Sequence, residues 1–296
     1  MLYFLITLVF FSSIEVVSKD LMKYLGPFEM TFIRFFIGGL VLLTFSFFNG
    51  AHKQLRDLGR SDYSLMALLG FVNIFFSMTM LQYAIKYGEP AVVALIISSN
   101  PIFVYIISLL LKHEVVSIKK ISGFILGITG ISIVLIKNFN DLALEAGALY
   151  ALIGAVSFAG FTILNKKAVS KHSPLIVNII SFAFGLICIG IFFALRGSLD
   201  ITAELFDSPV RITKLFYLGI FVTAISYITF LTAIKRIGPV ASSLVFLFKP
   251  AVATLFSVMF LSEDIRLNFF IGLVLSSIGS YLILKKNKMP ETVCAK

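Results

Sequence analysis

Three ionisable residues lie inside long apolar stretches of the sequence: Glu15, Arg34 and Lys249. At the centre of a lone membrane helix each such charge costs roughly 2.5–3.5 kcal/mol or more, so these residues seldom face lipid. We expect them to line a polar cavity inside a helical bundle, where a solute or a coupling ion can bind. The alternative is a set of ion pairs or carbonyl contacts that only fixes helix packing.

The depth of each charge follows from the helical rise of about 1.5 Å per residue. Glu15 lies ~12 Å and Arg34 ~8 Å below the outer ends of two neighbouring helices, so their side chains could meet. Lys249 lies ~15 Å from the inner end of a later helix, close to the bilayer midplane. We expect Lys249 to be a cation that faces the transport pathway.

Two of these stretches share a proline that follows a polar residue, in Asn100-Pro101 and Lys249-Pro250. Proline removes one helical hydrogen bond and clashes with the carbonyl group four residues back. We therefore expect helix kinks at Pro101 and Pro250 beside a central site. Kinks that serve only the shape of the bundle are the alternative.

Uncharged polar side chains are further candidates for the lining of that site. They are Asn73, Asn100 and Tyr227. Such groups also serve as contacts between neighbouring membrane helices, and the sequence does not separate the two roles.

The composition decides the environment of these residues. Hydrophobic residues make up 59% of the 296 residues and charged residues 14%, with a mean hydropathy of +1.01. A soluble domain carries about 25% charged residues. A surface this apolar needs lipid as its solvent, so the chain is expected to be an all-α integral membrane protein. The net charge of +10 then indicates basic loops at the cytoplasmic face and not nucleic-acid binding.

Cysteine and histidine give no sign of a metal site or a cofactor. The two cysteines show no ligand or disulfide spacing, and His52, His113 and His172 fall in expected loops. Acidic residues are scattered over the loops and do not cluster as in an enzyme active site. We expect no cofactor, no metal and no enzymatic activity.

Ten stretches approach the length of about 20 apolar residues that a membrane helix needs. The first lacks the basic start and the cleavage site of a signal peptide, so we keep it as a span. The expected spans are 2–23, 29–49, 64–86, 90–111, 119–137, 144–166, 174–195, 212–234, 239–261 and 268–285.

The distribution of positive charge sets the orientation of these spans. With both termini in the cytoplasm, fifteen lysine and arginine residues fall on the inner side and eight on the outer side. Positive residues are enriched in cytoplasmic loops. The sequence therefore predicts a multi-pass protein of the cell membrane with cytoplasmic termini and an external loop at 196–211.

The second half of the chain repeats the first at an offset of 149 residues. The matched positions include Pro90 and Pro239, Pro101 and Pro250, Gly123 and Gly272, and Gly130 and Gly279. Because each half holds five spans, an odd number, the halves enter the membrane in opposite directions, as in many secondary transporters. We expect two inverted five-helix repeats, at 1–140 and 141–286, and a cytoplasmic tail at 287–296.

The repeated motifs also carry a resemblance. They are Arg34-Phe35, then Pro101, Lys112-His113-Glu114, Gly123 and Gly130, and again Pro250, Leu261-Ser262-Glu263, Gly272 and Gly279. Over roughly 2–285 the chain resembles the EamA family of the drug/metabolite transporter superfamily. The resemblance implies a ten-helix fold with cytoplasmic termini and the export of metabolites, amino acids or drugs.

The chain departs from this family where Trp-Gly is common in the first helix of each repeat. It has Ser12-Ser13 in the first repeat and Phe158-Ala159 in the second. Substrate contacts that depend on the tryptophan therefore cannot be carried over.

The leading hypothesis is a secondary transporter that exports a small metabolite by alternating access. If Arg34 neutralises Glu15, Lys249 leaves the cavity net positive, which favours an amino acid, another zwitterion or an organic anion. If Glu15 is free, it can exchange protons, and an exporter of cationic amines or drugs coupled to protons is the alternative. Uniport and exchange for a counter-substrate are equally compatible with the sequence.

An alternative of another class is a non-transporting membrane subunit or a lipid-handling subunit. The expected partners are a small-molecule substrate and the lipid bilayer, with protons or a counter-substrate as further options. Gly123-x-x-x-Gly127 is a close-packing motif, and it leaves open a homodimer.

Overall fold

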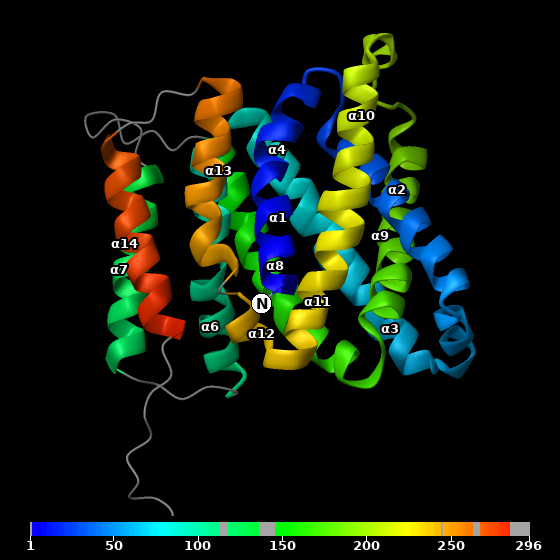
Figure 1. Ribbon diagram of the computed structural model, residues 1–296, viewed down its shortest axis with the longest axis horizontal. Coiled ribbons are helices and arrows are strands. Elements are labelled where there is room, and N and C mark those ends of the chain that lie inside the picture. The colour runs from blue at the N-terminus through cyan, green and yellow to red at the C-terminus, as the bar shows by residue number, and fades with distance from the viewer. Residues whose placement is uncertain (1, 113–117, 136–145, 244, 263–266, 285–296) are drawn as a thin grey trace, which may run out of the picture.

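The computed structural model describes residues 2–112, 118–135, 146–243, 245–262 and 267–284, and these residues form a bundle of helices (Figure 1). The α-helices are α1 (Leu2–Leu21), α2 (Pro27–Phe48), α3 (Arg60–Gly70), α4 (Thr79–Tyr87), α5 (Pro90–Ser98), α6 (Asn100–Leu110), α7 (Ile118–Leu135), α8 (Ala146–Lys171), α9 (Pro174–Arg196), α10 (Pro209–Tyr217), α11 (Ser226–Ile237), α12 (Pro239–Ser242), α13 (Val245–Leu261) and α14 (Leu267–Leu284). The predicted all-α class is confirmed. Glu114, Glu263, the boundary at 140–141 and the tail 287–296 lie outside the described residues.

Several helices start at a proline. Pro27, Pro90, Pro174, Pro209 and Pro239 each occupy the first helical position of α2, α5, α9, α10 and α12. Proline suits this position because its fixed φ matches the helix and its missing N–H would have no helical partner there.

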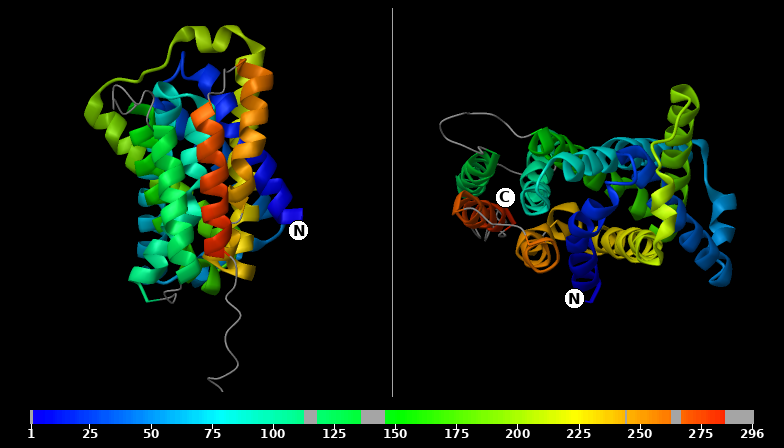
Figure 2. Two further views of the ribbon diagram at one scale, coloured as in Figure 1. Left: turned by 90° about the vertical axis from the view of Figure 1, so that its left-hand side faces the viewer. Right: turned by 90° about the horizontal axis from the view of Figure 1, so that it is seen from above.

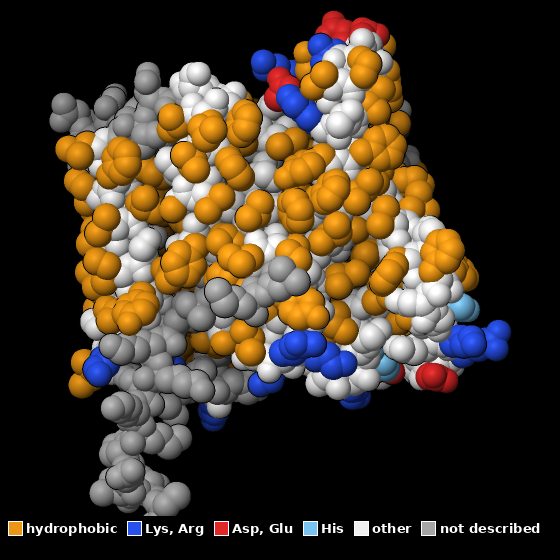
Figure 3. All heavy atoms as spheres, viewed as in Figure 1, with side chains coloured by type: hydrophobic (Ala, Val, Ile, Leu, Met, Phe, Trp, Pro, Cys, Tyr) orange, Lys and Arg blue, Asp and Glu red, His pale blue; other side chains and the backbone are white. Residues whose placement is uncertain are grey.

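Among the described residues, seven helical stretches are long and apolar enough to cross a membrane. They are Pro27–Phe48, Arg60–Tyr87, Pro90–Leu110, Ala146–Lys171, Pro174–Arg196, Pro209–Ile237 and Pro239–Leu261. Helices α7 and α14 run beside them along the same axis (Figure 1), and α1 is tilted against them (Figure 2). Figure 3 shows a mainly hydrophobic face whose charged side chains gather at its two ends. The chain is therefore a multi-pass membrane protein, and the number of ten spans stays a prediction.

Two of the long stretches contain a π-helical segment. Phe71–Met78 (η2) joins α3 to α4, and Leu218–Ile225 (η4) joins α10 to α11. Both segments have eight residues, and the second begins 147 positions after the first. Extra residues in a helical turn are common at functional sites, so these segments mark where the bundle departs from regular packing.

Helices α7 and α14 pack closely at one edge of the bundle (Figure 2). A Cβ atom on Gly123 would lie 2.7 Å from the carbonyl oxygen of Gly279, and a Cβ atom on Gly279 would lie 2.6 Å from the backbone nitrogen of Gly127. Such a close approach requires glycine at these positions. The Gly123-x-x-x-Gly127 motif therefore serves a contact within the chain, and the homodimer stays a prediction.

The segment after α9 binds the turn between α1 and α2. The backbone N–H of Gly26 donates to the carbonyl of Asp200 at 2.8 Å, and that of Thr202 donates to the carbonyl of Tyr24 at 3.0 Å. The buried carboxylate of Glu29 accepts from the Asp200 N–H at 3.0 Å and lies 3.5 Å from Arg196. These contacts fix the 197–208 connection to the end of the bundle that we expect to be external.

Candidate functional site

Glu15 on α1 and Lys249 on α13 form an ion pair inside the bundle. The Lys249 ammonium donates to Oε1 of Glu15, and the two side chains are only 3% (Lys249) and 0% (Glu15) exposed. The other carboxylate oxygen of Glu15, Oε2, has no hydrogen-bond partner among the described residues. The pair therefore cancels its own charge and keeps one free acceptor.

The two serines that precede Glu15 are satisfied within α1. Ser12 Oγ donates to the Leu8 carbonyl at 2.7 Å, and Ser13 Oγ donates to the Phe10 carbonyl at 2.9 Å. Hydroxyl groups often return to the preceding helical turn in this way. An ionised carboxylate such as that of Glu15 cannot donate a hydrogen bond to the preceding turn. Its charge is balanced by Lys249 on α13.

Arg34 on α2 is fully buried and largely unsatisfied. Its Nη2 lies 3.1 Å from the sulfur of Met78, and its guanidinium carbon lies 4.9 Å from the ring centre of Phe35. Its Nε and Nη1 groups have no hydrogen-bond partner among the described residues. A buried cation normally has an anion or several acceptors, because its desolvation is otherwise uncompensated. Arg34 therefore presents free donors to whatever enters the site.

The depth estimate alone did not identify the partner of Glu15. It brought Glu15 to the height of Arg34, but among the described residues Glu15 forms its ion pair with Lys249. The reason is packing, since α13 lies directly against α1 and carries a long side chain toward the carboxylate. Glu15, Arg34 and Lys249 together still carry one net positive charge. Because Lys249 pairs with Glu15, that charge is on Arg34 and not on Lys249.

Tyr227 and Asn73 connect the two π-helical regions. The Tyr227 hydroxyl, at the start of α11, donates to Asn73 Oδ1 in η2 at 3.3 Å. Both side chains are buried, and Asn73 Nδ2 has no partner among the described residues. These two sequence candidates thus contact each other, and they keep one amide donor available.

A cavity of about 30 Å³ brings several of these groups together. Its lining residues are Phe11, Ile14, Arg34, Met78, Leu81, Ile97, Phe158, Tyr227, Phe246 and Lys249. The space suffices for about one or two water molecules and is far too small for a metabolite. In this structure the cavity beside Arg34 has no room for a solute of metabolite size.

Aromatic rings form much of the wall of this cavity. The Tyr227 ring lies 5.6 Å from that of Phe11 and 5.5 Å from that of Phe35, and the rings of Phe158 and Phe246 are 5.6 Å apart. Faces of aromatic rings attract cationic and planar groups. The cavity thus combines one free guanidinium group with an aromatic enclosure.

Asn100 and Pro101 follow a break between two helices, and Pro250 lies inside a continuous helix. Asn100 Nδ2 donates to the Ala155 carbonyl of α8 at 3.4 Å, and Asn100 does not line the 30 Å³ cavity. Pro101 stands in the first turn of α6, directly after the break between α5 and α6 at Ser99. Pro250 lies inside α13, next to the paired Lys249.

Sequence reasoning missed the hydrophobic part of the site. Four apolar residues that line the cavity were not predicted: Phe11, Met78, Phe158 and Phe246. The chain holds 32 phenylalanines and 8 methionines, and residue type alone does not separate these four from the rest. A weak signal existed at Phe158, which occupies the position where relatives of this kind carry Trp-Gly in the second repeat. Its ring now stands at the cavity wall.

Comparison with known proteins assigns the chain to a family. Residues 1–136 and 145–285 match the EamA-like transporter family. The chain belongs to this family. The resemblance seen in the motifs is thereby confirmed, and so is the expectation of a transporter and not an enzyme.

Two transporters and one solved structure are similar to this chain over different lengths. An uncharacterized transporter of Clostridium kluyveri is 31% identical over 297 residues, which cover 97% of this chain and 93% of that protein. An S-adenosylmethionine uptake transporter of Rickettsia felis is 30% identical over 171 residues, 58% of this chain and 56% of that protein. A crystal structure with 18% identity superposes with a TM-score of 0.66 over 95% of this chain and 94% of the other, which shows a shared fold.

Proposed function

We propose that this chain is a secondary transporter of the cell membrane that moves small metabolites with a carboxylate group by alternating access. The observation that carries the proposal is the buried Arg34, whose Nε and Nη1 groups lack partners beside an aromatic cavity. A guanidinium group binds a carboxylate through charge-assisted hydrogen bonds, and such bonds are strong where water is excluded. Arg34 thus takes the role that sequence reasoning gave to Lys249.

The substrate class follows from the charges that remain. Glu15 and Lys249 neutralise each other, and Arg34 leaves one positive charge at the cavity. An organic anion or the zwitterionic head of an amino acid complements that charge. In a zwitterion the ammonium group would bind the free Oε2 of Glu15 while the carboxylate binds Arg34.

The aromatic wall favours a substrate with a planar or cationic remainder. Rings attract a sulfonium or ammonium group through their faces. S-adenosylmethionine, which joins an amino-acid head to a sulfonium centre and a purine, is a member of this class. The similarity to transporters named for its uptake supports it as the first compound to test.

The alternative of a cationic drug exporter coupled to protons through Glu15 has weaker support. That function needs a carboxylate with spare negative charge in the cavity. Glu15 already has a lysine partner, so a cation without a carboxylate would meet the positive charge of Arg34 and have no group to bind it.

The proposed architecture is ten spans in two inverted five-helix repeats, with both termini in the cytoplasm. Support comes from the π-helical segments 147 positions apart and from the pairing of α7 with α14. Gly123 lies near Gly279 and Gly130 lies near Gly272, so the fifth and last helices cross in antiparallel directions. This is the relation that an inverted repeat requires of its equivalent helices.

Flux measurements in proteoliposomes test the proposal. Labelled amino acids, organic acids and S-adenosylmethionine are supplied inside or outside, so that export and uptake are both measured. We expect saturable flux of a carboxylate-bearing solute that is lost in Arg34→Gln. Flux that is confined to cations without a carboxylate, and that survives in Arg34→Gln, would overturn the assignment.

A further inference from the structure

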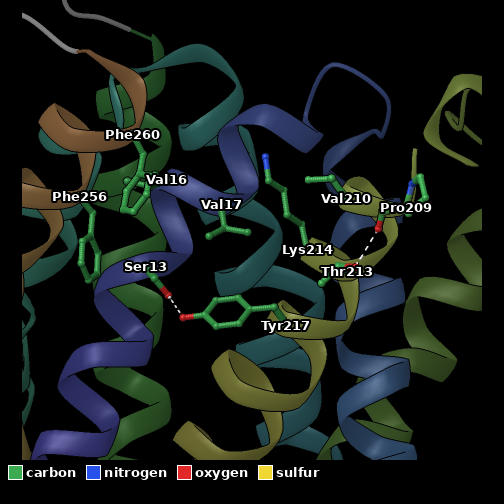
Figure 4. Close-up of a pocket in the computed structure, with 10 residues that line it drawn as sticks. All are labelled: Ser13, Val16, Val17, Pro209, Val210, Thr213, Lys214, Tyr217, Phe256 and Phe260. Atoms are coloured by element: carbon green, nitrogen blue, oxygen red, sulfur yellow. Dashed lines mark hydrogen bonds between the residues drawn. The ribbon is translucent and has the colours of Figure 1, made fainter. Parts of the chain in front are cut away.

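A second and much larger cavity opens between α1, α10 and α13. It has a volume of about 550 Å³ and is shown in Figure 4. Its lining residues are Ser13, Val16, Val17, Pro209, Val210, Thr213, Lys214, Tyr217, Phe256 and Phe260. We call it the α1–α10–α13 groove. It is separate from the cavity beside Arg34, because the two share no lining residue.

The tilt of α1 explains why the groove exists. Figure 2 shows the N-terminal end of α1 projecting from the bundle, while its other end lies between the neighbouring helices. Helices α13 and α10 therefore stand on either side of a receding helix (Figure 1). Val17 on α1 forms part of the back of the groove, and Phe256 and Val210 stand on its two walls (Figure 4).

The polar groups of the groove are Thr213, whose hydroxyl donates to the Pro209 carbonyl at 2.9 Å, and one pair of side chains at each end. At one end Ser13 Oγ and the Tyr217 hydroxyl hydrogen-bond to each other at 2.9 Å, so neither demands a ligand. At the other end Lys214 binds Asp20 at 2.6 Å, and both side chains are about one third exposed (35% and 36%). An ammonium group has three donors, and the contact with Asp20 uses one of them.

This arrangement matches an amphiphile that lies along the bilayer. Apart from Thr213, the walls between the two ends are aliphatic and aromatic, and they extend over ~12 Å of α10. Val210 and Phe260 are 62% and 69% exposed, so the groove is continuous with the hydrophobic face of the molecule. The accessible ammonium of Lys214 stands near the charged end of that face, where lipid phosphates are found.

We propose that the α1–α10–α13 groove holds one phospholipid, with an acyl chain between Val17 and Phe256 and the phosphate at Lys214. Helices α1 and α13, which form the groove, also carry Glu15 and Lys249. A lipid in the groove therefore supports the two helices that position the ion pair. Transport of any particular solute is not needed for this inference.

The absence of tryptophan from the sequence gives a clean test. Phe256→Trp puts a fluorescent reporter in the groove. Phe216→Trp, on α10 and 51% exposed but outside the groove, puts a matched reporter against bulk lipid. Each variant is reconstituted in vesicles of phosphatidylglycerol with brominated acyl chains, and the bromine atoms quench the tryptophan fluorescence. The vesicles are then diluted into an excess of unbrominated vesicles and detergent.

We expect fluorescence to recover at once for Phe216→Trp and at least about tenfold more slowly for Phe256→Trp, because a bound lipid leaves slowly. Val17→Phe narrows the groove from its back and should remove the delay. Val210→Phe does the same from an exposed position, where a larger side chain is expected to leave folding unchanged. Lys214→Gln should shorten the delay. Equal recovery at the two reporters, or a delay that persists in a folded Val210→Phe protein, would overturn the proposal.

Discussion

The carboxylate of Glu15 and the ammonium group of Lys249 form a buried pair between residues 234 positions apart in the sequence. The pair joins α1 to α13 and leaves Arg34 as the cation with free donors at the cavity. We propose that the three charges have two different roles: Glu15 and Lys249 hold helices together, and Arg34 binds a substrate.

Removal of one member of the pair should destabilise the protein strongly. Glu15→Gln or Lys249→Met leaves a buried charge without its partner, which costs about 3–5 kcal/mol. The double variant removes both charges and should recover most of that loss. Thermal unfolding of the purified proteins in detergent measures the effect.

A suitable control is Lys167→Met, which removes an exposed lysine of α8 and should change stability by less than about 0.5 kcal/mol. Independent, additive losses in the double variant would show that the two side chains do not act as a pair. They would also return Lys249 to the role of an isolated cation.

Arg34 should behave in the opposite way to the pair. Arg34→Gln removes a buried cation whose Nε and Nη1 groups have no partners, so stability should stay the same or rise. Flux of a carboxylate-bearing solute should fall by about 100-fold, the equivalent of roughly 3 kcal/mol of lost charged hydrogen bonding. Flux and melting temperature are measured on the same preparations.

Arg34→Lys is the matched control, because it keeps the charge but not the planar guanidinium group. Partial flux in Arg34→Lys with none in Arg34→Gln would agree with recognition of a carboxylate. A loss of stability in Arg34→Gln as large as that in Glu15→Gln would instead identify Arg34 as a packing residue.

The sequence was informative about which charges are buried and less so about their partners. Helical rise gives the height of Glu15 and Arg34, but it does not give the direction in which each side chain leaves its helix. That direction depends on how α13 packs against α1, a contact between distant parts of the chain. The all-α class and the family followed from composition and short motifs, since these are local properties.

The aromatic wall and the π-helical segments could not be predicted from single residues. Phe11 and Phe246 differ from the other phenylalanines only in the neighbours that the fold gives them. The segment Phe71–Met78 contains no proline or glycine that would mark an irregular turn. Both features arise from packing, which the sequence specifies only through the whole bundle.

The glycine contact between α7 and α14 should tolerate no side chain. A Cβ atom on Gly279 would lie 2.5 Å from the carbonyl oxygen of Gly123, so Gly279→Ala should force the helices apart and cost about 1–3 kcal/mol. Gly190→Ala is the control, because nothing lies within 4 Å of its Cβ position in α9. The Gly190→Ala variant should leave the free energy of unfolding unchanged or raise it by up to about 1 kcal/mol, because alanine has the higher helix propensity. Equal melting temperatures for the two variants would contradict the close α7–α14 contact.

The orientation in the membrane can be tested at the 197–208 connection. The excess of fifteen over eight positive residues favours cytoplasmic termini, which places this connection outside. Ser198 is exposed, and Lys53 is an exposed residue expected on the inner side. Single cysteines at these positions are made after Cys188 and Cys294 are replaced by serine. A membrane-impermeant maleimide should label Ser198→Cys in intact cells and Lys53→Cys only after permeabilisation. The reverse labelling pattern would place both termini outside and would contradict the predicted orientation of the bundle in the membrane. The Glu15–Lys249 pair and the cavity beside Arg34 do not depend on that orientation.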